Sequence, residues 1–155
     1  MKQLIKRVLF IIPFFLLSMT ISAQETEAYK KAKMEIQEQF GIFPSMFEAY
    51  PKHALAGAWE NFKQLNSPTS KIPPKYRELL QLAVAAQIPC AYCIYFHTES
   101  AKAFGATDEE IKEAVAQGAA TRQWSMILQG NEIDFEKFKT EFNSMMKFMS
   151  EKSKK

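Results

Sequence analysis

Residues 76–97, with the sequence YRELLQLAVAAQIPCAYCIYFH, decide the fold of this chain and carry its chemistry. The stretch holds both cysteines, Cys90 and Cys93, and one of the two histidines, His97. Residues three and four apart lie on one face of an α-helix, so a helix through this segment places the three side chains together. Pro89 suits the first position of that helix. Cys90 would then lie in the first turn, where the helix dipole favours a thiolate.

Glu78 stands at the start of a run, residues 79–86, that is apolar nearly all round, as expected of a helix packed in the core. If the chain turns at residues 87–89 and returns antiparallel, Glu78 and His97 both lie roughly 14–15 Å from the bend, at about 1.5 Å per residue. A carboxylate, an imidazole and a thiol then meet at one buried position. This arrangement is a proton relay, and a relay that ends on a thiol indicates redox chemistry.

The first 23 residues are predicted to be a secretory signal peptide, with cleavage before Gln24. Three basic residues precede an apolar segment, residues 8–17, and Ala23 completes a suitable cleavage site. An uncleaved membrane anchor is the alternative, although the apolar run is short for a span of about 20 residues. We therefore expect a periplasmic or secreted protein, in a compartment where a disulfide can persist.

A chain of 155 residues is long enough for one domain with a substantial core. We assign that domain to residues 24–150 and a basic tail to residues 151–155. Removal of residues 1–23 removes three basic groups and no acidic ones, so the formal net charge falls from +3 to 0. No basic face remains to bind nucleic acid, and we expect no membrane association after cleavage.

The pattern of the mature chain predicts helices joined by short turns. They are expected over residues 25–39, 45–50 and 52–65, through Glu78, through the cysteines to Gly105, from Thr107 to Gly130, and over 133–149. Thr107 and Glu110 form a capping-box pattern, and small residues around Gly118 would let another helix approach closely. No stretch shows the alternation of a strand. The chain is therefore predicted to be all-α, with six or seven helices. Phenylalanine and methionine along one side of the last helix indicate core packing or a subunit contact.

The spacing Glu78, Cys90-Ala-Tyr-Cys93 and His97 resembles the signature of the alkylhydroperoxidase-D-like branch of the carboxymuconolactone decarboxylase family. The motifs FGIFP at residues 40–44 and FGATDEEI at residues 104–111 are similar to the segments that flank this signature in the family. The resemblance covers roughly residues 36–130 and implies an all-helical, alkylhydroperoxidase-D-like fold and a homo-oligomer, a trimer or a hexamer.

The resemblance also implies an activity and a role for each site residue. Cys93 corresponds to the thiolate that attacks peroxide, Cys90 to the resolving thiol, His97 to the base, and Glu78 to the group that orients that base or takes its proton. The partners implied are a hydroperoxide substrate and a dithiol or thioredoxin-like reductant, with no cofactor or metal. Decarboxylases of the wider family lack the cysteine pair, which disfavours a lactone substrate. This chain has Tyr92 where the well-studied alkylhydroperoxidase has a histidine.

Several other interpretations of the same residues stay open. The cysteines could form a structural disulfide, although a loop this short stabilises a fold by about 2 kcal/mol at most. With His97 and Glu78 they could also form a tetrahedral metal site. The pair could serve thiol–disulfide exchange on protein or small-thiol partners, or be vestigial. Glu78 could pair with Arg77 or Lys75 instead of His97. Tyr92 and Tyr95 flank the cysteines and either line a pocket or simply pack.

Overall fold

The computed structural model describes residues 26–154, and the predicted signal segment therefore lies outside the described residues. The described chain contains seven helices and no strand, as predicted. These helices fall into two compact units within the described residues, one that ends at Leu65 and one that begins at Asn66. None of the described helices is long and apolar enough to cross a bilayer.

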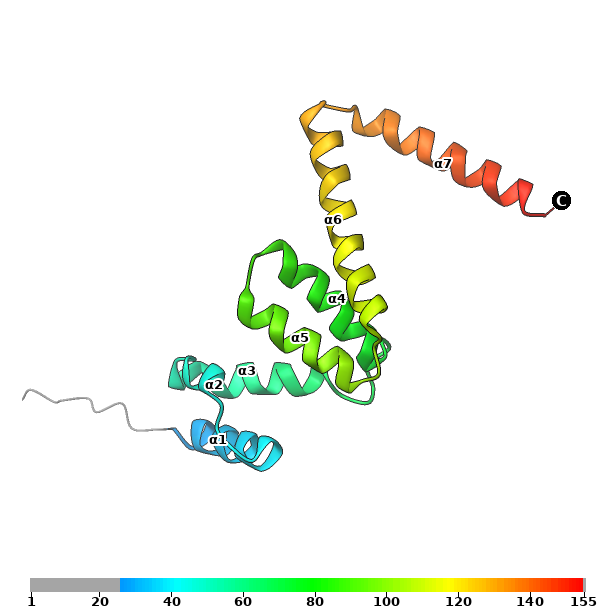
Figure 1. Cartoon of the computed structure of the whole chain (residues 1–155). Helices are drawn as coiled ribbons and strands as arrows, with labels where there is room; N and C mark the ends of the chain where they lie inside the picture. The colour runs from blue at the N-terminus through cyan, green and yellow to red at the C-terminus, as the bar shows by residue number, and fades with distance from the viewer. Residues whose placement is uncertain (1–25, 155) are drawn as a thin grey trace, which may run out of the picture. The chain divides into compact units, whose positions relative to one another are not determined.

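The described part of the first unit consists of α1 (Glu27–Phe40), α2 (Ser45–Glu48) and α3 (Lys52–Leu65), coloured blue to cyan-green in Figure 1. Gly41 ends α1 with φ of 75°, a left-handed conformation that favours glycine, and its N–H donates to the Gln37 carbonyl. Packing between α1 and α3 holds the unit together.

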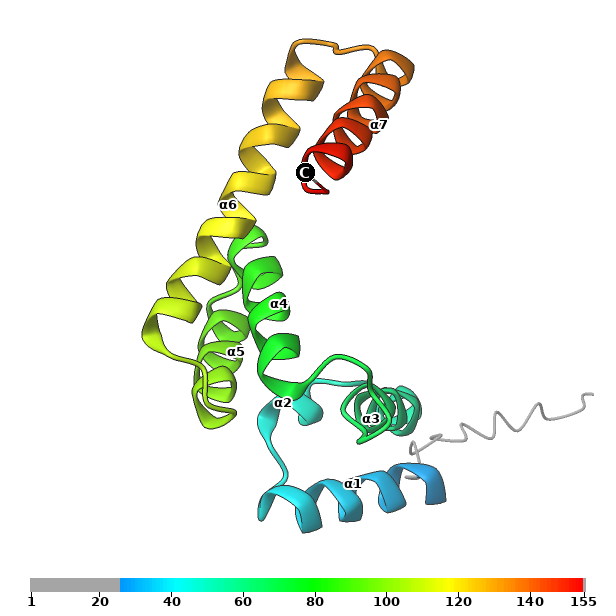
Figure 2. The ribbon, with the colours of Figure 1, turned by 90° about the vertical axis from the view of Figure 1, so that its right-hand side faces the viewer.

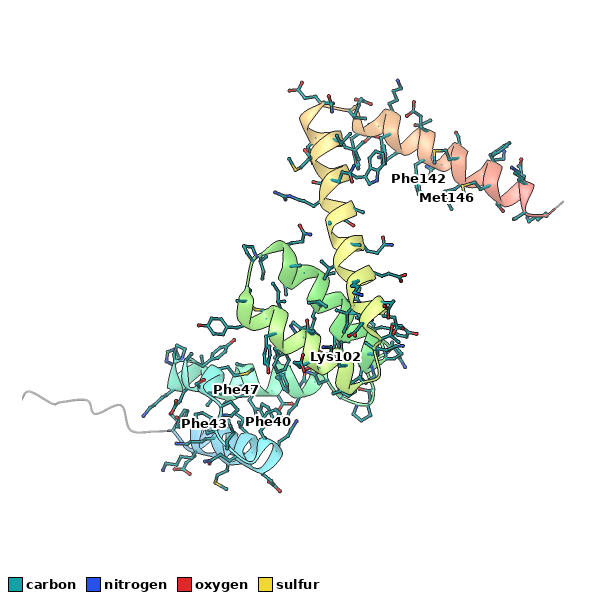
Figure 3. The ribbon with its side chains drawn as sticks, viewed as in Figure 1. Phe40, Phe43, Phe47, Lys102, Phe142 and Met146 are labelled. Carbon is teal, nitrogen blue, oxygen red and sulfur yellow. A yellow bond between two sulfur atoms is a disulfide. The ribbon has the colours of Figure 1, made fainter. Side chains whose placement is uncertain are left out.

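The core of this unit comes from residues at helical spacing. Its buried members are Tyr29, Ala32, Ile36, Phe47, Leu55 and Trp59. Phe40 and Phe47 stack with ring centroids 6.1 Å apart, and Figure 3 shows both near Phe43. Trp59 donates its indole N–H to Glu35 at 2.8 Å, and Lys63 donates to the same carboxylate oxygen at 2.7 Å. The hydrogen bond from the Lys63 ammonium is the largest cause of the lowered pKa of Glu35. The hydrogen bond from the Trp59 indole lowers this pKa further. This contact joins α1 to α3.

The second unit consists of α4 (Pro74–Gln87), α5 (Ala91–Ala103), α6 (Asp108–Gly130) and α7 (Phe135–Lys152). Helix α4 packs against both α5 and α6 (Figures 1 and 2). Gly105 has φ of 82° and lies in the turn after α5. Thr107 and Glu110 make both hydrogen bonds of the predicted capping box, which starts α6.

Gly118 allows α4 and α6 to approach closely, as its small size predicted. A Cβ atom at this position would lie 3.1 Å from the Ala83 backbone oxygen and 3.3 Å from the Gln87 amide nitrogen. Any side chain here would therefore push the two helices apart. Helix α4 is also tied to the first turn of α6 by Lys75, whose ammonium lies 2.7 Å from the Glu110 carboxylate.

Two observed features differ from the sequence-based expectation. Only one face of α4, which includes Glu78, Leu82 and Ala85, is buried, although the helix is apolar nearly all round. The opposite stripe is half exposed, at residues Tyr76, Leu80, Val84 and Ile88. The last helix starts at Phe135, since Asp134 caps it by accepting the Lys137 N–H at 2.6 Å, and it continues to Lys152, into the segment assigned to a tail.

Candidate redox site

The candidate site is built on the hairpin formed by α4 and α5. Helix α4 begins at Pro74, a residue suited to a first helical turn, and ends at Gln87. The connection is short: Ile88 N–H donates to the Val84 carbonyl, and Cys90 N–H donates to the Ala85 carbonyl. A turn of this length makes the next helix an antiparallel neighbour, and both views show α4 and α5 side by side (Figures 1 and 2).

Cys90 and Cys93 form a disulfide, with their Cα atoms 5.3 Å apart. Cys90 lies two positions earlier relative to the helix start than expected, because α5 begins at Ala91 and not at Pro89. It is the N-cap of α5, with extended backbone angles, and its Sγ accepts the Cys93 N–H at 3.2 Å. Pro89 therefore precedes the helix instead of opening it. The sulfur of Cys90 lies beside the free N–H groups of the first turn, where a negative charge is stabilised.

Glu78 meets His97 as the hairpin geometry predicted. The Glu78 Oε2 atom lies 2.8 Å from His97 Nδ1, and Glu78 is only 4% exposed. A carboxyl group buried to this degree needs a hydrogen-bonding partner, and His97 provides one. An ionised carboxylate only accepts hydrogen bonds, so His97 then carries its proton on Nδ1 and keeps the lone pair on Nε2. The imidazole is thereby oriented to accept a proton at Nε2.

Cys93 and His97 are four residues apart in α5 and share one face of the helix, where Cβ atoms are separated by about 5–6 Å. The Phe96 ring lies edge-on to the imidazole, with centroids 5.2 Å apart. Both Cys93 and His97 are partly exposed. The site therefore combines a buried carboxylate, an imidazole in contact with it and a partly exposed disulfide.

One of the two alternative partners for Glu78, Lys75, contacts another residue. Its ammonium contacts Glu110 on α6, and this hydrogen bond raises the pKa of Lys75 and lowers that of Glu110. Sequence reasoning missed this link between α4 and α6. Glu110 was recognised only as a capping residue, although its second carboxylate oxygen remains available after capping.

Tyr92 and Tyr95 lie on the surface beside the disulfide. Tyr92 is 89% exposed and Tyr95 is 73% exposed. Their assignment to a substrate pocket stays a prediction. Among the described residues, no group of three or more histidine, cysteine, aspartate or glutamate side chains is arranged to hold a metal ion.

The chain is similar to known proteins in sequence and in fold. The sequence model of the carboxymuconolactone decarboxylase family matches residues 53–133. An uncharacterised protein of Cupriavidus necator is 31% identical over 91 residues, which span 59% of this chain and 76% of that protein. The crystal structure of the alkylhydroperoxidase AhpD core from Rhodospirillum rubrum superimposes with a TM-score of 0.62. The sequence identity is 25%, over 72% of this chain and 85% of the other.

Proposed function

This chain belongs to the carboxymuconolactone decarboxylase family, and from that premise we propose that it is a thiol-dependent peroxidase of the alkylhydroperoxidase type. The observation that carries the proposal is the buried Glu78–His97 contact on the helix pair that also holds the Cys90–Cys93 disulfide. A purely structural disulfide needs no oriented imidazole on the same helix face. A lactone decarboxylase has no use for the cysteine pair.

The first chemical step is the oxidation of Cys93 by the hydroperoxide. His97 Nε2 takes the proton of the Cys93 thiol, and Glu78 stabilises the imidazolium that results. The thiolate attacks the terminal peroxide oxygen, and the O–O bond breaks. The departing alkoxide takes the proton back from His97 and leaves as an alcohol. Cys93 becomes a sulfenic acid, oxidised by the two electrons that reduce the peroxide.

The second step closes the disulfide. The Cys90 thiolate, favoured by its position at the N-terminus of α5, attacks the Cys93 sulfur. The S–O bond breaks, and the hydroxyl group leaves as water with the proton that Cys90 gave up. An external dithiol then returns the pair to the reduced form, and is itself oxidised to a disulfide. The cycle requires no metal, flavin or haem.

The partners follow from this cycle and from the N-terminal sequence. The oxidising substrate is a hydroperoxide, and the electron donor is a dithiol or a thioredoxin-like protein. If residues 1–23 direct export, the donor must act in the periplasm or outside the cell.

Thiol–disulfide exchange is the second candidate function, and one observation favours it. Cys90 is the N-cap residue, and its sulfur accepts a backbone hydrogen bond at the start of α5. A cysteine in this position has a stabilised thiolate, which suits it to attack or leave in exchange reactions. In this case Glu78 and His97 would assist the transfer of protons between the two sulfurs, and peroxide would be an incidental oxidant.

Rapid-mixing experiments on the fully reduced protein separate the two functions. A peroxidase consumes cumene hydroperoxide rapidly, and Cys93→Ser abolishes the reaction. Cys90→Ser still reacts once and accumulates a sulfenic acid that dimedone traps. His97→Asn slows the reaction, whereas His53→Asn, the matched change at an exposed histidine, does not. Slow peroxide consumption together with rapid reduction of a peptide disulfide would establish exchange. Failure in both assays would overturn both functions.

A further inference from the structure

A hollow lies at the corner where α6 ends and α7 begins, and none of the redox-site residues lines it. Figure 1 shows this corner at the end of α6 that is farther from the α4–α5 pair. The hollow has a volume of about 480 Å³, within the range of about 300–1,000 Å³ that is usual for small-molecule sites. Its apolar lining comes from Leu128, Ile133, Phe135 and Phe138. A hollow of this size and lining can hold a small organic molecule.

The backbone at this corner forms a Schellman motif, a helix ending in which one residue adopts the left-handed conformation. The Ile133 N–H donates to the Leu128 carbonyl at 3.1 Å, and the Glu132 N–H donates to the Gln129 carbonyl at 3.1 Å. Glu132 is the left-handed residue, with φ of 51°. The motif brings Leu128 and Ile133 together, and both residues line the hollow. The same backbone ending therefore builds the apolar wall and places Glu132 beside it.

Glutamate is an unusual residue for this backbone position. Glycine is preferred there because it has no Cβ atom, and a larger residue in the left-handed conformation lowers the stability of the fold. This chain has glycine at the two other described positions with positive φ, Gly41 and Gly105. Glu132 therefore occupies its position at a cost in stability. Costs of this kind are concentrated at functional sites, where the side chain has a role that glycine cannot fill.

The polar part of the lining carries a negative charge. Ser125 and Gln129 lie four residues apart on one side of α6, and Glu132 follows them at the corner. Glu132 is the one ionisable residue among those that line the hollow. The lysines in the first turns of α7 are paired with other carboxylates, Lys137 with Glu141 and Lys139 with Glu136. The Glu132 carboxylate is therefore available to a positively charged ligand.

The phenylalanine rings of the lining add a second preference for positive charge, because the face of an aromatic ring attracts cations. Phe135 already does so within the chain, since the Lys139 ammonium lies 5.3 Å from its ring centroid. Phe138 is 37% exposed, and its ring stacks on Phe142 with centroids 6.3 Å apart, which supports the ring from one side. The hollow thus presents apolar side chains, ring faces and a carboxylate to the same ligand.

We propose that the corner between α6 and α7 binds a small organic cation, a primary ammonium group on an apolar body. The ammonium group lies at the Glu132 carboxylate, and the side-chain oxygens of Ser125 and Gln129 accept its other hydrogens. The apolar body lies against Leu128 and Phe138. A neutral ligand of the same shape lacks the ion pair, and an anionic one is repelled. This site and the redox site lie on different helices, so neither proposal depends on the other.

Titration of the full chain with 2-phenylethylammonium at neutral pH, followed by amide chemical shifts, tests this proposal. The matched ligand is 2-phenylethanol, which has nearly the same shape and no charge. We expect the ammonium to bind at least tenfold more tightly than the alcohol, with shifts concentrated at residues 125–138. In Glu132→Gln the two ligands should bind equally. Glu109→Gln, which changes an exposed glutamate in the first turn of α6, should keep the preference. Equal affinity of the wild type for both ligands, binding of neither, or loss of the preference in the control would overturn the proposal.

The variant Glu132→Gly separates the loss of the carboxylate from damage to the fold. Because glycine adopts φ of 51° without strain, this variant should melt at a higher temperature than the wild type and yet lose the preference for the ammonium. A lower melting temperature or a retained preference would overturn the proposal. Shifts of the same amides when the protein concentration is raised without ligand, and no further shift when ligand is added, would also overturn it and assign the hollow to a second copy of the chain.

Discussion

Replacing Glu78 by glutamine should slow the reaction of Cys93 with hydroperoxide about tenfold and leave the fold intact. Glutamine has nearly the shape of glutamate, and its carbonyl oxygen can still accept a hydrogen bond from a protonated His97 Nδ1, the atom that lies 2.8 Å from the carboxylate oxygen. The change therefore removes the negative charge and keeps the hydrogen bond. The imidazolium formed during thiol deprotonation loses its counter-charge.

The magnitude follows from replacing a hydrogen bond to a charged group by a hydrogen bond between neutral groups. A bond to a charged group contributes about 1.5–3 kcal/mol, and one between neutral groups about 0.5–1.5 kcal/mol. The difference is on the order of 1.4 kcal/mol, which corresponds to about a tenfold change in rate. Because Glu78 is only 4% exposed, solvent does little to reduce this difference.

The assay is stopped-flow oxidation of the reduced protein by cumene hydroperoxide, with circular dichroism and thermal unfolding on the same samples. Glu99→Gln is the matched control, since Glu99 lies on α5 with Cys93 and His97 and its side chain is 53% exposed. An unchanged rate in Glu78→Gln would refute the relay. So would an equal loss in Glu99→Gln, because the effect would then not depend on the contact with His97.

Three further predictions concern the packing that positions the site. Leu82→Ala should cost about 2–5 kcal/mol in denaturant unfolding, because Leu82 is 1% exposed, whereas Leu80→Ala on the exposed side of α4 should cost much less. Gly118→Val should lower the free energy of unfolding by about 1–3 kcal/mol, because its Cβ would meet the backbone of α4 at 3.1 Å. The pKa of Glu110 is lowered by Lys75, so the stability from this ion pair is present above the ordinary carboxyl pKa and lost as the pH falls through the lowered value. Lys75→Gln should therefore reduce the melting temperature at neutral pH, and the difference from wild type should vanish in acid.

Much of the fold could be predicted from the sequence, because the starts and ends of most helices depend on residues that are close together in the chain. The capping-box pattern of Thr107 and Glu110 predicted the start of α6. Both hydrogen bonds of the capping box are present in the structure. The helix over residues 52–65 has the predicted bounds. The end of α7 was less predictable, since residues near Lys152 are compatible with both a helix and a tail.

Part of the site was predictable for the same reason. Cys93 and His97 share a helix face because they are four residues apart, and Glu78 is level with His97 because the connection between the helices is short. The N-cap position of Cys90 was not predicted. Pro89 suits a first helical position, but the sulfur of Cys90 accepts the Cys93 N–H as an N-cap, and the helix starts at Ala91, two residues after Pro89.

The sequence alone determined which residues lie on the same side of each helix, because the spacing along the chain and 3.6 residues per turn decide it. Only the tertiary structure decided how each helix is rotated against its neighbours. That rotation turns Glu78 inward to His97, sends Lys75 to Glu110, and leaves the apolar stripe through Leu80 exposed. The close approach at Gly118 sets the distance between α4 and α6, and a contact between residues this far apart in the chain depends on the packing of whole helices.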